Sequence, residues 1–394
     1  MSEWKKVKLG EICGRLTSGG TPKANVSSYY NPPTIPWLKT KEVNYCRITE
    51  TENYISEEGL KNSSAKIISP NSVIIAMYGQ GDTAGRVAIN KIPLATNQAC
   101  CNLTIDKSKA DYEFIYYQLC TLYDKLVSLK AGAAQPNLNA RIIKNLEIIM
   151  PSLPIQHRIA TILSRYDSLI ENYQKQIKLL EEAAQRLYKE WFIDLRFPGH
   201  ENTNIIDGVP EGWEKKKLHE IAEVVMGSSP KSEFYNNDKQ GLPFHQGVGS
   251  YGTRFVDDNV YSTSITRLAE PNSILFSVRA PVGRLNITKN KIIIGRGLAA
   301  MNHKDGFQSF LFYMLKERFF MDNIIGNGSI FASISKVELL DQEFIVPPMK
   351  TIKAFESLAS KLDKKIQGVD TQLRLLTEAR DRLLPKLMSG EITV

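Results

Sequence analysis

The sequence predicts an α+β protein in which two repeated globular domains alternate with two long helices, which pair as an antiparallel coiled coil with pseudo-twofold symmetry. Three observations predict this fold. Local strings from the first half recur in the second half, a heptad pattern of apolar residues follows each copy, and prolines stand where each copy gives way to its heptads.

The repeat is clearest at the two ends of each copy. The opening string Trp4-Lys5-Lys6-Val7-Lys8-Leu9-Gly10-Glu11-Ile12 recurs 209 residues later as Trp213-Glu214-Lys215-Lys216-Lys217-Leu218-His219-Glu220-Ile221. The closing string Ile148-Ile149-Met150-Pro151 recurs 196 residues later as Phe344-Ile345-Val346-Pro347. We therefore expect one domain at residues 1–151 and a shorter copy at 212–347, each mixing short strands (73–77, 292–294) with helices (112–125, 307–320).

Each copy is followed by apolar residues at steps of 4 and 3, which is the a/d pattern of a coiled coil. This predicts a central helix at 152–196, a connector at 197–211 and a C-terminal helix at 348–394. The seam between the helices is expected to contain Leu163, Ile170, Ile177, Leu180, Leu362, Ile366, Leu373 and Leu376. Arg380 falls on the same pattern, so it must reach solvent or pair with a neighbouring carboxylate.

Composition excludes several classes of protein. The 394 residues carry 50 Lys plus Arg and 42 Asp plus Glu, and the net charge of +8 is compatible with a polyanionic partner. The apolar runs are too short for a membrane span, and the first residues lack the apolar run of a signal peptide. Five cysteines without a CxxC pair indicate reduced thiols in a cytoplasmic protein. The histidines are scattered, with no paired Cys/His spacing, so we expect no metal site.

Polar and basic side chains stand on Gly-rich turns at matching places in the two copies. Arg, Asn and Gln have the donor and acceptor geometry that matches base edges, and Lys suits phosphates. The candidate DNA-binding residues are Lys39, Lys41, Tyr78, Gln80, Arg86, Asn97, Gln98, Gln135 and Asn137 in the first copy, and Gln246, Arg279, Arg284, Arg296 and Ser333 in the second.

One string suggests catalysis. Asn31-Pro32-Pro33-Thr34 resembles the Asn-Pro-Pro-aromatic loop of amino-methyltransferases, but Thr offers no ring to stack on a flipped base. The glycines of Gly79-Gln80-Gly81-Asp82-Thr83-Ala84-Gly85 do not fit a cofactor-binding GxGxxG. We therefore expect no catalytic residues. A self-contained DNA adenine methyltransferase remains the alternative, and a coiled-coil scaffold without a DNA role is the third hypothesis.

The architecture and several strings resemble the specificity subunit of type I restriction-modification enzymes. The resemblance spans essentially the whole chain and includes Gly132-Ala133-Ala134-Gln135-Pro136-Asn137 before the first helix, Leu187-Tyr188-Lys189-Glu190-Trp191-Phe192 at its end, and Leu384-Pro385-Lys386-Leu387-Met388-Ser389-Gly390 near the C-terminus. The second copy departs from the first of these strings, which puts the carry-over of Gln135 to that copy in doubt.

The resemblance implies functions that the periodicity does not. Each globular copy would be a target-recognition domain that reads one half of a bipartite, asymmetric site in double-stranded DNA. The helices would set the spacing and dock two modification subunits, which would carry S-adenosylmethionine, so this chain would need no cofactor of its own. Restriction subunits with motor and nuclease activity would join the complex.

Overall fold

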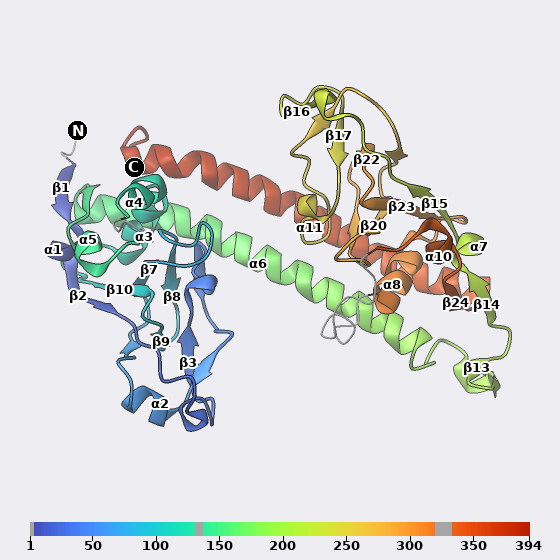
Figure 1. The fold of residues 1–394 in the computed structure, drawn as a ribbon, viewed down its shortest axis with the longest axis horizontal. Coiled ribbons are helices and arrows are strands. Elements are labelled where there is room, and N and C mark those ends of the chain that lie inside the picture. The colour runs from blue at the N-terminus through green and yellow to red at the C-terminus, as the bar shows by residue number, and fades with distance from the viewer. Residues whose placement is uncertain (1–3, 131–136, 320–332) are drawn as a thin grey trace. The chain divides into compact units, whose positions relative to one another are not determined.

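The computed structural model describes residues 4–130, 137–319 and 333–394. The chain divides into two compact units, one formed by Met1–Asn172 with Leu373–Val394 and the other by Tyr173–Gln372. Each unit contains one β-rich copy and a part of each of two long helices, α6 (Leu153–Phe192) and α11 (Met349–Ser389) (Figure 1). The protein is α+β, as the sequence predicts.

The first copy contains two larger sheets. In one, the strand order is β2-β10-β7-β8-β4, and in the other it is β5-β3-β9-β6. The strands are β2 (Cys13–Ser18), β3 (Ile35–Leu38), β4 (Cys46–Ile48), β5 (Tyr54–Ile55), β6 (Ile67–Ile68), β7 (Val73–Ala76), β8 (Val87–Asn90), β9 (Leu94–Thr96) and β10 (Cys100–Ile105). The helices are α1 (Leu9–Ile12), α2 (Glu57–Lys61), α3 (Tyr112–Cys120), α4 (Tyr123–Ser128) and α5 (Ala140–Lys144), with 3-10 turns η1 (Ser27–Tyr29) and η2 (Thr40–Glu42).

The second copy repeats this plan with sheets β15-β23-β20-β21 and β16-β18-β17-β22-β19. The strands are β15 (Ala222–Met226), β16 (Tyr235–Asn236), β17 (Leu242–His245), β18 (Tyr261–Ser262), β19 (Leu268–Ala269), β20 (Ile274–Ser277), β21 (Leu285–Ile287), β22 (Ile292–Ile294) and β23 (Leu298–His303). The helices are α7 (Leu218–Ile221), α8 (Gln308–Phe319) and α10 (Lys336–Leu340), with 3-10 turns η4 (Ser232–Phe234) and η5 (Val248–Ser250).

The first and last strands of each copy pair with each other. In the first copy β1 (Lys5–Lys8) is antiparallel to β11 (Glu147–Met150), and in the second β14 (Glu214–Lys217) is antiparallel to β24 (Glu343–Val346). The partners of Lys5 and Glu214 are Met150 and Val346, so the register is the same in both copies. Each copy therefore enters and leaves at one place, next to the start of its long helix.

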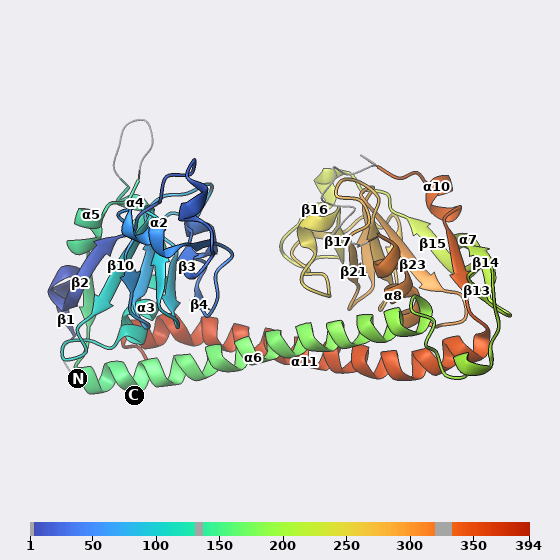
Figure 2. The same ribbon diagram turned by 90° about the horizontal axis from the view of Figure 1, so that it is seen from below.

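The long helices are α6 (Leu153–Phe192) and α11 (Met349–Ser389). In the first unit Arg380, late in α11, contacts Asp167, early in α6, and in the second unit Phe355, early in α11, packs on Trp191, late in α6. The two helices are therefore antiparallel, as predicted (Figure 2). Ile159 and Leu163 share the core of the first copy with Leu387, and Phe355 and Ala359 share that of the second, so each sheet core continues into a helix face.

The structure differs from the sequence-based prediction in three places. Helix α6 ends at Phe192 rather than 196, because Leu195 adopts a left-handed conformation (φ 57°) that ends a helix. The helix predicted at 112–125 is two helices, separated where the hydroxyl of Thr121 donates to the carbonyl of Gln118 (2.8 Å). The connector at 197–211 contains a 3-10 turn, η3 (His200–Asn202), and a small hairpin of β12 (Ile205–Ile206) and β13 (Val209–Pro210).

Other predicted elements agree with the structure. The strand predicted at 292–294 is β22, and the strand predicted at 73–77 is β7, which ends one residue earlier. Within the described ranges, no helix combines the length and apolar character that crossing a membrane would require.

Candidate nucleic-acid interface

Two parallel strands bring several candidate residues of the first copy to one edge. Strand β3 pairs in parallel with β9, so Lys39 and Asn97 each follow the same end of neighbouring strands. The backbone N–H of Asn97 donates to the carbonyl of Leu38 (2.9 Å), which joins these two ends directly. The ammonium of Lys39 lies 5.1 Å from the centre of the Trp37 ring and donates to Asn53 Oδ1 (2.8 Å).

The hairpin between β7 and β8 lies at the same end of the copy. Tyr78 and Gln80 leave β7, and Arg86 enters β8. The backbone N–H of Met77 donates to the carbonyl of Ala99 (2.7 Å), so the hairpin adjoins Gln98. The N–H of Leu138 donates to the carbonyl of Met77 (3.0 Å), which brings Asn137 to the same place.

The side chain of Arg86 is held in place while it remains partly exposed. Its Nη2 donates to Asp82 Oδ1 (2.5 Å), and its Nη1 donates to Asn44 Oδ1 (3.0 Å). The hydrogen bond from Arg86 lowers the pKa of the Asp82 carboxyl. Gln98 accepts a hydrogen bond from the hydroxyl of Thr21, whereas Lys41 and Gln80 are exposed. Such an edge presents a preorganised guanidinium together with amides and amines.

The second copy repeats the strand-end arrangement with different side chains. Strand β17 is parallel to β22, and the N–H of Gly297 donates to the carbonyl of Gln246 (3.2 Å). The hydroxyl of Ser229 donates to Gln246 Oε1 (2.7 Å) and accepts from the backbone N–H of Arg296 (3.1 Å). Gln246 and Arg296 therefore lie at the edge that corresponds to Lys39 and Asn97.

The hairpin of the second copy also corresponds to that of the first. Arg279 and Arg284 flank the turn between β20 and β21. Arg279 forms an antiparallel bridge with Ser333, and the N–H of Ile334 donates to the carbonyl of Val278 (3.0 Å). Arg279, Arg296 and Ser333 are exposed, and Arg284 is partly buried. In each copy the described candidates thus converge at one end of the sheets, while Gln135 lies outside the described residues.

The structure also bears on two other points of the sequence analysis, the Asn-Pro-Pro string and the question of a metal site. The string Asn31-Pro32-Pro33-Thr34 is an exposed turn after η1, where the N–H of Asn31 donates to the carbonyl of Ser27 (3.1 Å). Among the described residues no group of three or more His, Cys, Asp and Glu side chains is arranged to hold a metal ion.

The predicted seam residues differ in burial. Leu163, Ile170, Ile177 and Ile366 are buried, whereas Leu180, Leu362, Leu373 and Leu376 are partly buried. Arg380 donates from Nη1 to Asp167 Oδ1 (2.9 Å), so it pairs with a carboxylate across the helices of the first unit. Asp167 is itself 5% exposed, although it is not one of the predicted seam residues.

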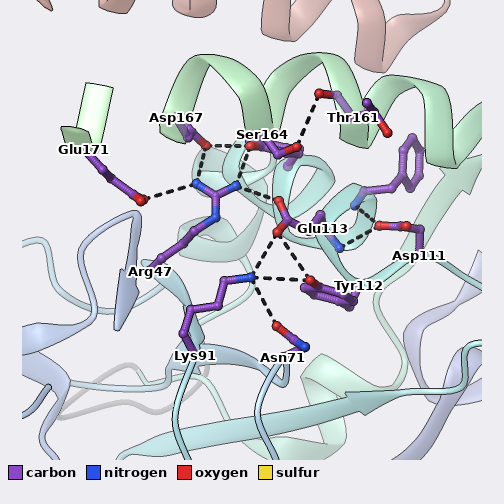
Figure 3. Close-up of polar contacts among 12 residues, drawn as sticks. Arg47, Asn71, Lys91, Asp111, Tyr112, Glu113, Thr161, Ser164, Asp167 and Glu171 are labelled. Atoms are coloured by element: carbon purple, nitrogen blue, oxygen red, sulfur yellow. Dashed lines mark hydrogen bonds and ion pairs between the residues drawn. The ribbon is translucent and has the colours of Figure 1, made fainter. Parts of the chain in front are cut away.

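Asp167 belongs to a buried ionic network that the sequence analysis missed (Figure 3). Its Oδ2 accepts from Arg47 Nη1 (2.9 Å) and from the hydroxyl of Tyr117 (2.5 Å). Arg47 Nη2 also donates to Glu113 Oε2 (2.6 Å), and Lys91 Nζ donates to Glu113 Oε1 (3.1 Å). Burial raises the pKa of Tyr117, and the charge of Asp167 raises it further.

An arginine, a tyrosine and an aspartate also meet in the second unit. Asp363 Oδ1 accepts from Arg254 Nη2 (2.6 Å) and from the hydroxyl of Tyr313 (2.7 Å). The guanidinium of Arg254 also lies over the Phe312 ring at 3.6 Å and faces Glu181 Oε1 at 3.6 Å.

A sequence signal for this pair of networks was present. Arg47 and Arg254 each lie 12 residues after the start of the strand that the repeat aligns, at Ile35 and Leu242. The two tyrosines are 196 residues apart, and so are the two aspartates. A search for apolar heptads overlooks these residues because they are polar. That the same Arg, Tyr and Asp occur at matching positions of two diverged copies nevertheless indicates that they form a buried contact in each.

The chain is related in sequence to known proteins. A family model described as the type I restriction modification DNA specificity domain matches residues 1–182 and 210–373. The specificity subunit of the type I restriction enzyme MjaIX from Methanocaldococcus jannaschii is 31% identical over 415 residues, covering 100% of this chain and 94% of that protein. The HindI specificity subunit from Haemophilus influenzae is 20% identical and covers 100% of both chains.

A solved structure has the same fold. The crystal structure of the type I restriction-modification S subunit from M. genitalium matches with a TM-score of 0.64 at 18% identity, over 98% of this chain and 96% of that one.

Proposed function

Because the chain belongs to the family of type I restriction-modification specificity subunits, which determine DNA specificity and are not themselves catalytic, we propose that each β-rich copy reads one half of a bipartite, asymmetric DNA target. The observation that carries this proposal is the convergence of polar and basic side chains at equivalent ends of the two copies. Guanidinium and amide groups there match base edges, and the amines match phosphates.

We further propose that α6 and α11 set the distance between the half-sites and dock two modification subunits. Leu179 and Leu375 support this, because they are 53% and 52% exposed and occupy the same position in the repeat. Two symmetry-equivalent exposed positions, one on each helix, would give two copies of one partner the same contact. Those subunits would bind S-adenosylmethionine, restriction subunits would complete the enzyme, and the complex would act in the cytoplasm.

The experiment removes one guanidinium from each proposed half-site reader. Methylation mapping of cells that express the chain with its modification subunits first defines the target. Arg86→Ala or Arg284→Ala should then cost about 1–3 kcal/mol of DNA affinity and relax one base position, if the side chain contacts a base. If it contacts a phosphate, all sequences should weaken alike, and the salt slope should fall by about one.

Matched controls come from the opposite ends of the same sheets. Lys107→Ala and Lys304→Ala remove exposed cations that follow β10 and β23, away from the hairpins. These controls should leave affinity and salt slope unchanged. If both arginine variants behave like the lysine controls, the hairpin ends do not read DNA.

A further inference from the structure

We propose that Arg47 and Arg254 are positioning residues for DNA reading, each of which fixes a DNA-reading hairpin to the long helices so that the gap between half-sites is measured strictly. The inference rests on the proposed function, because it concerns how the two reading ends are held. Neither arginine lies at the proposed DNA edge. Both are buried against helix carboxylates, at Asp167 and Asp363.

In the first copy a short path connects the helix to the hairpin. Arg47 lies on β4, which pairs in parallel with β8, and β8 begins directly after Arg86. Three residues before Arg47, the side chain of Asn44 accepts a hydrogen bond from Arg86 Nη1 (3.0 Å). One segment therefore contacts the carboxylate of α6 through Arg47 and the DNA-reading guanidinium through Asn44.

The second copy contains an equivalent path. The carbonyl of Arg254 accepts from the N–H of Ile287 (3.0 Å), which is on β21, the strand that begins directly after Arg284. Asn286 Nδ2, on the same strand, donates to the carbonyl of Gly252 (2.9 Å), two residues before Arg254. The segment that carries Arg254 thus supports the hairpin strand at two points.

Stability alone does not account for keeping these ions in both copies. Replacing a buried ion pair with apolar side chains is often neutral or stabilising, and the best-supported use of buried ions is to fix register. Apolar core positions are matched only in part, since Phe114 and Phe310 coincide whereas Tyr116 and Phe312 differ; the Arg, Tyr and Asp of the two networks all coincide. A guanidinium can donate in several directions within one plane, which lets it fix the orientation of an edge strand as well as its distance.

The test measures the gap preference of the complete complex with its modification subunits. Binding is measured on the mapped target with its native gap and with gaps one base pair shorter and longer. Arg47→Met and Arg254→Met should lower the ratio of native-gap to altered-gap affinity at least tenfold, while base preference within each half-site persists. Tyr117→Phe and Tyr313→Phe, which remove one hydroxyl each and keep the ring, should lower the ratio by a smaller factor.

The control is Arg196→Met, which removes ion pairs to Glu190 and Asp194 outside both networks and should leave the ratio unchanged. If the wild-type complex itself ignores the gap, the proposed function fails. If the wild type is strict and the variants keep its ratio, even with a lower melting temperature, the arginines are only structural and the inference is wrong. Should the methionine variants fail to assemble, an unchanged ratio in both phenylalanine variants would equally overturn it.

Discussion

Glu113 is the residue at which the buried network of the first copy becomes sensitive to pH. Burial alone would raise the pKa of its carboxyl, but the hydrogen bond and charge of Arg47, aided by Lys91, lower it below the ordinary value of 4.5. A depressed folded-state pKa contributes stability that is present above the ordinary pKa and is lost as pH falls through the folded value.

We expect Glu113→Gln to destabilise the first unit by about 2 kcal/mol at pH 7, because charge-assisted hydrogen bonds to two cations are weakened. The difference from wild type should shrink as pH falls from about 4.5 through the lowered folded-state pKa, since the unfolded wild-type carboxyl takes up a proton first and the folded one follows. Denaturant unfolding at pH 7 and pH 3.5 measures both values. Glu50→Gln, at an exposed position, should show little difference at either pH, and a constant deficit for Glu113→Gln would contradict the ionic role.

The same network shows which residue-level features could be predicted from the sequence. The misfit of Arg380 in the heptads was visible, and so was its need for a carboxylate. Its partner was not, because Asp167 is not apolar and its burial results from Arg47, which is 120 residues away in the chain. The candidate DNA residues could be named one by one, but their convergence depends on the parallel pairs β3–β9 and β17–β22, which no local pattern specifies.

At the level of elements, the long helices were the most predictable part, because heptads run through most of their 40 and 41 residues. The structure adds which apolar positions are covered. Ile177 and Ile366 are 3% and 0% exposed, whereas Leu179 and Leu375 project outward from the same helices. The short helices were less predictable, since the pattern predicted over residues 112–125 continues across Thr121, where the structure ends one helix and begins another soon after.

Because these side chains differ in exposure, substitutions at them can test the folding of the helices and the docking of partners separately. Ile177→Asp or Ile366→Asp buries a carboxylate without a partner and should cost several kcal/mol of unfolding free energy unless the group protonates. Leu179→Asp or Leu375→Asp should leave the melting temperature within about 2 °C while weakening assembly with the modification subunits. Thermal unfolding and co-purification give the two readouts. Equal effects of the buried and exposed substitutions on both would show that the outward face has no docking role.

At the scale of the whole molecule, the repeat makes the two copies exchangeable. Residues 4–151 begin and end with paired strands in the same register as residues 213–347, so the cut points of one copy superimpose on those of the other. The buried contact between the copy and a long helix should be kept in the graft, because the grafted Arg47 and Tyr117 would meet Asp363, the counterpart of Asp167. The contact with Arg380 would be missing, since the equivalent position of α6 is Ala184.

A hybrid in which residues 4–151 replace residues 213–347 should therefore fold on unaltered helices and carry two identical readers. If the two identical readers are related by a twofold axis, as the sequence repeat predicts, they present the same contacts to opposite strands, and the hybrid should recognise a palindrome made of the first half-site, the original gap and the reverse complement of that half-site. The reciprocal graft should give the palindrome of the other half-site. Methylation mapping of cells that express each hybrid with the modification subunits reads out the target. Retention of the second original half-site by the first hybrid would mean that sequence reading is not divided between the copies, because the residues that read it would then lie outside the exchanged segment.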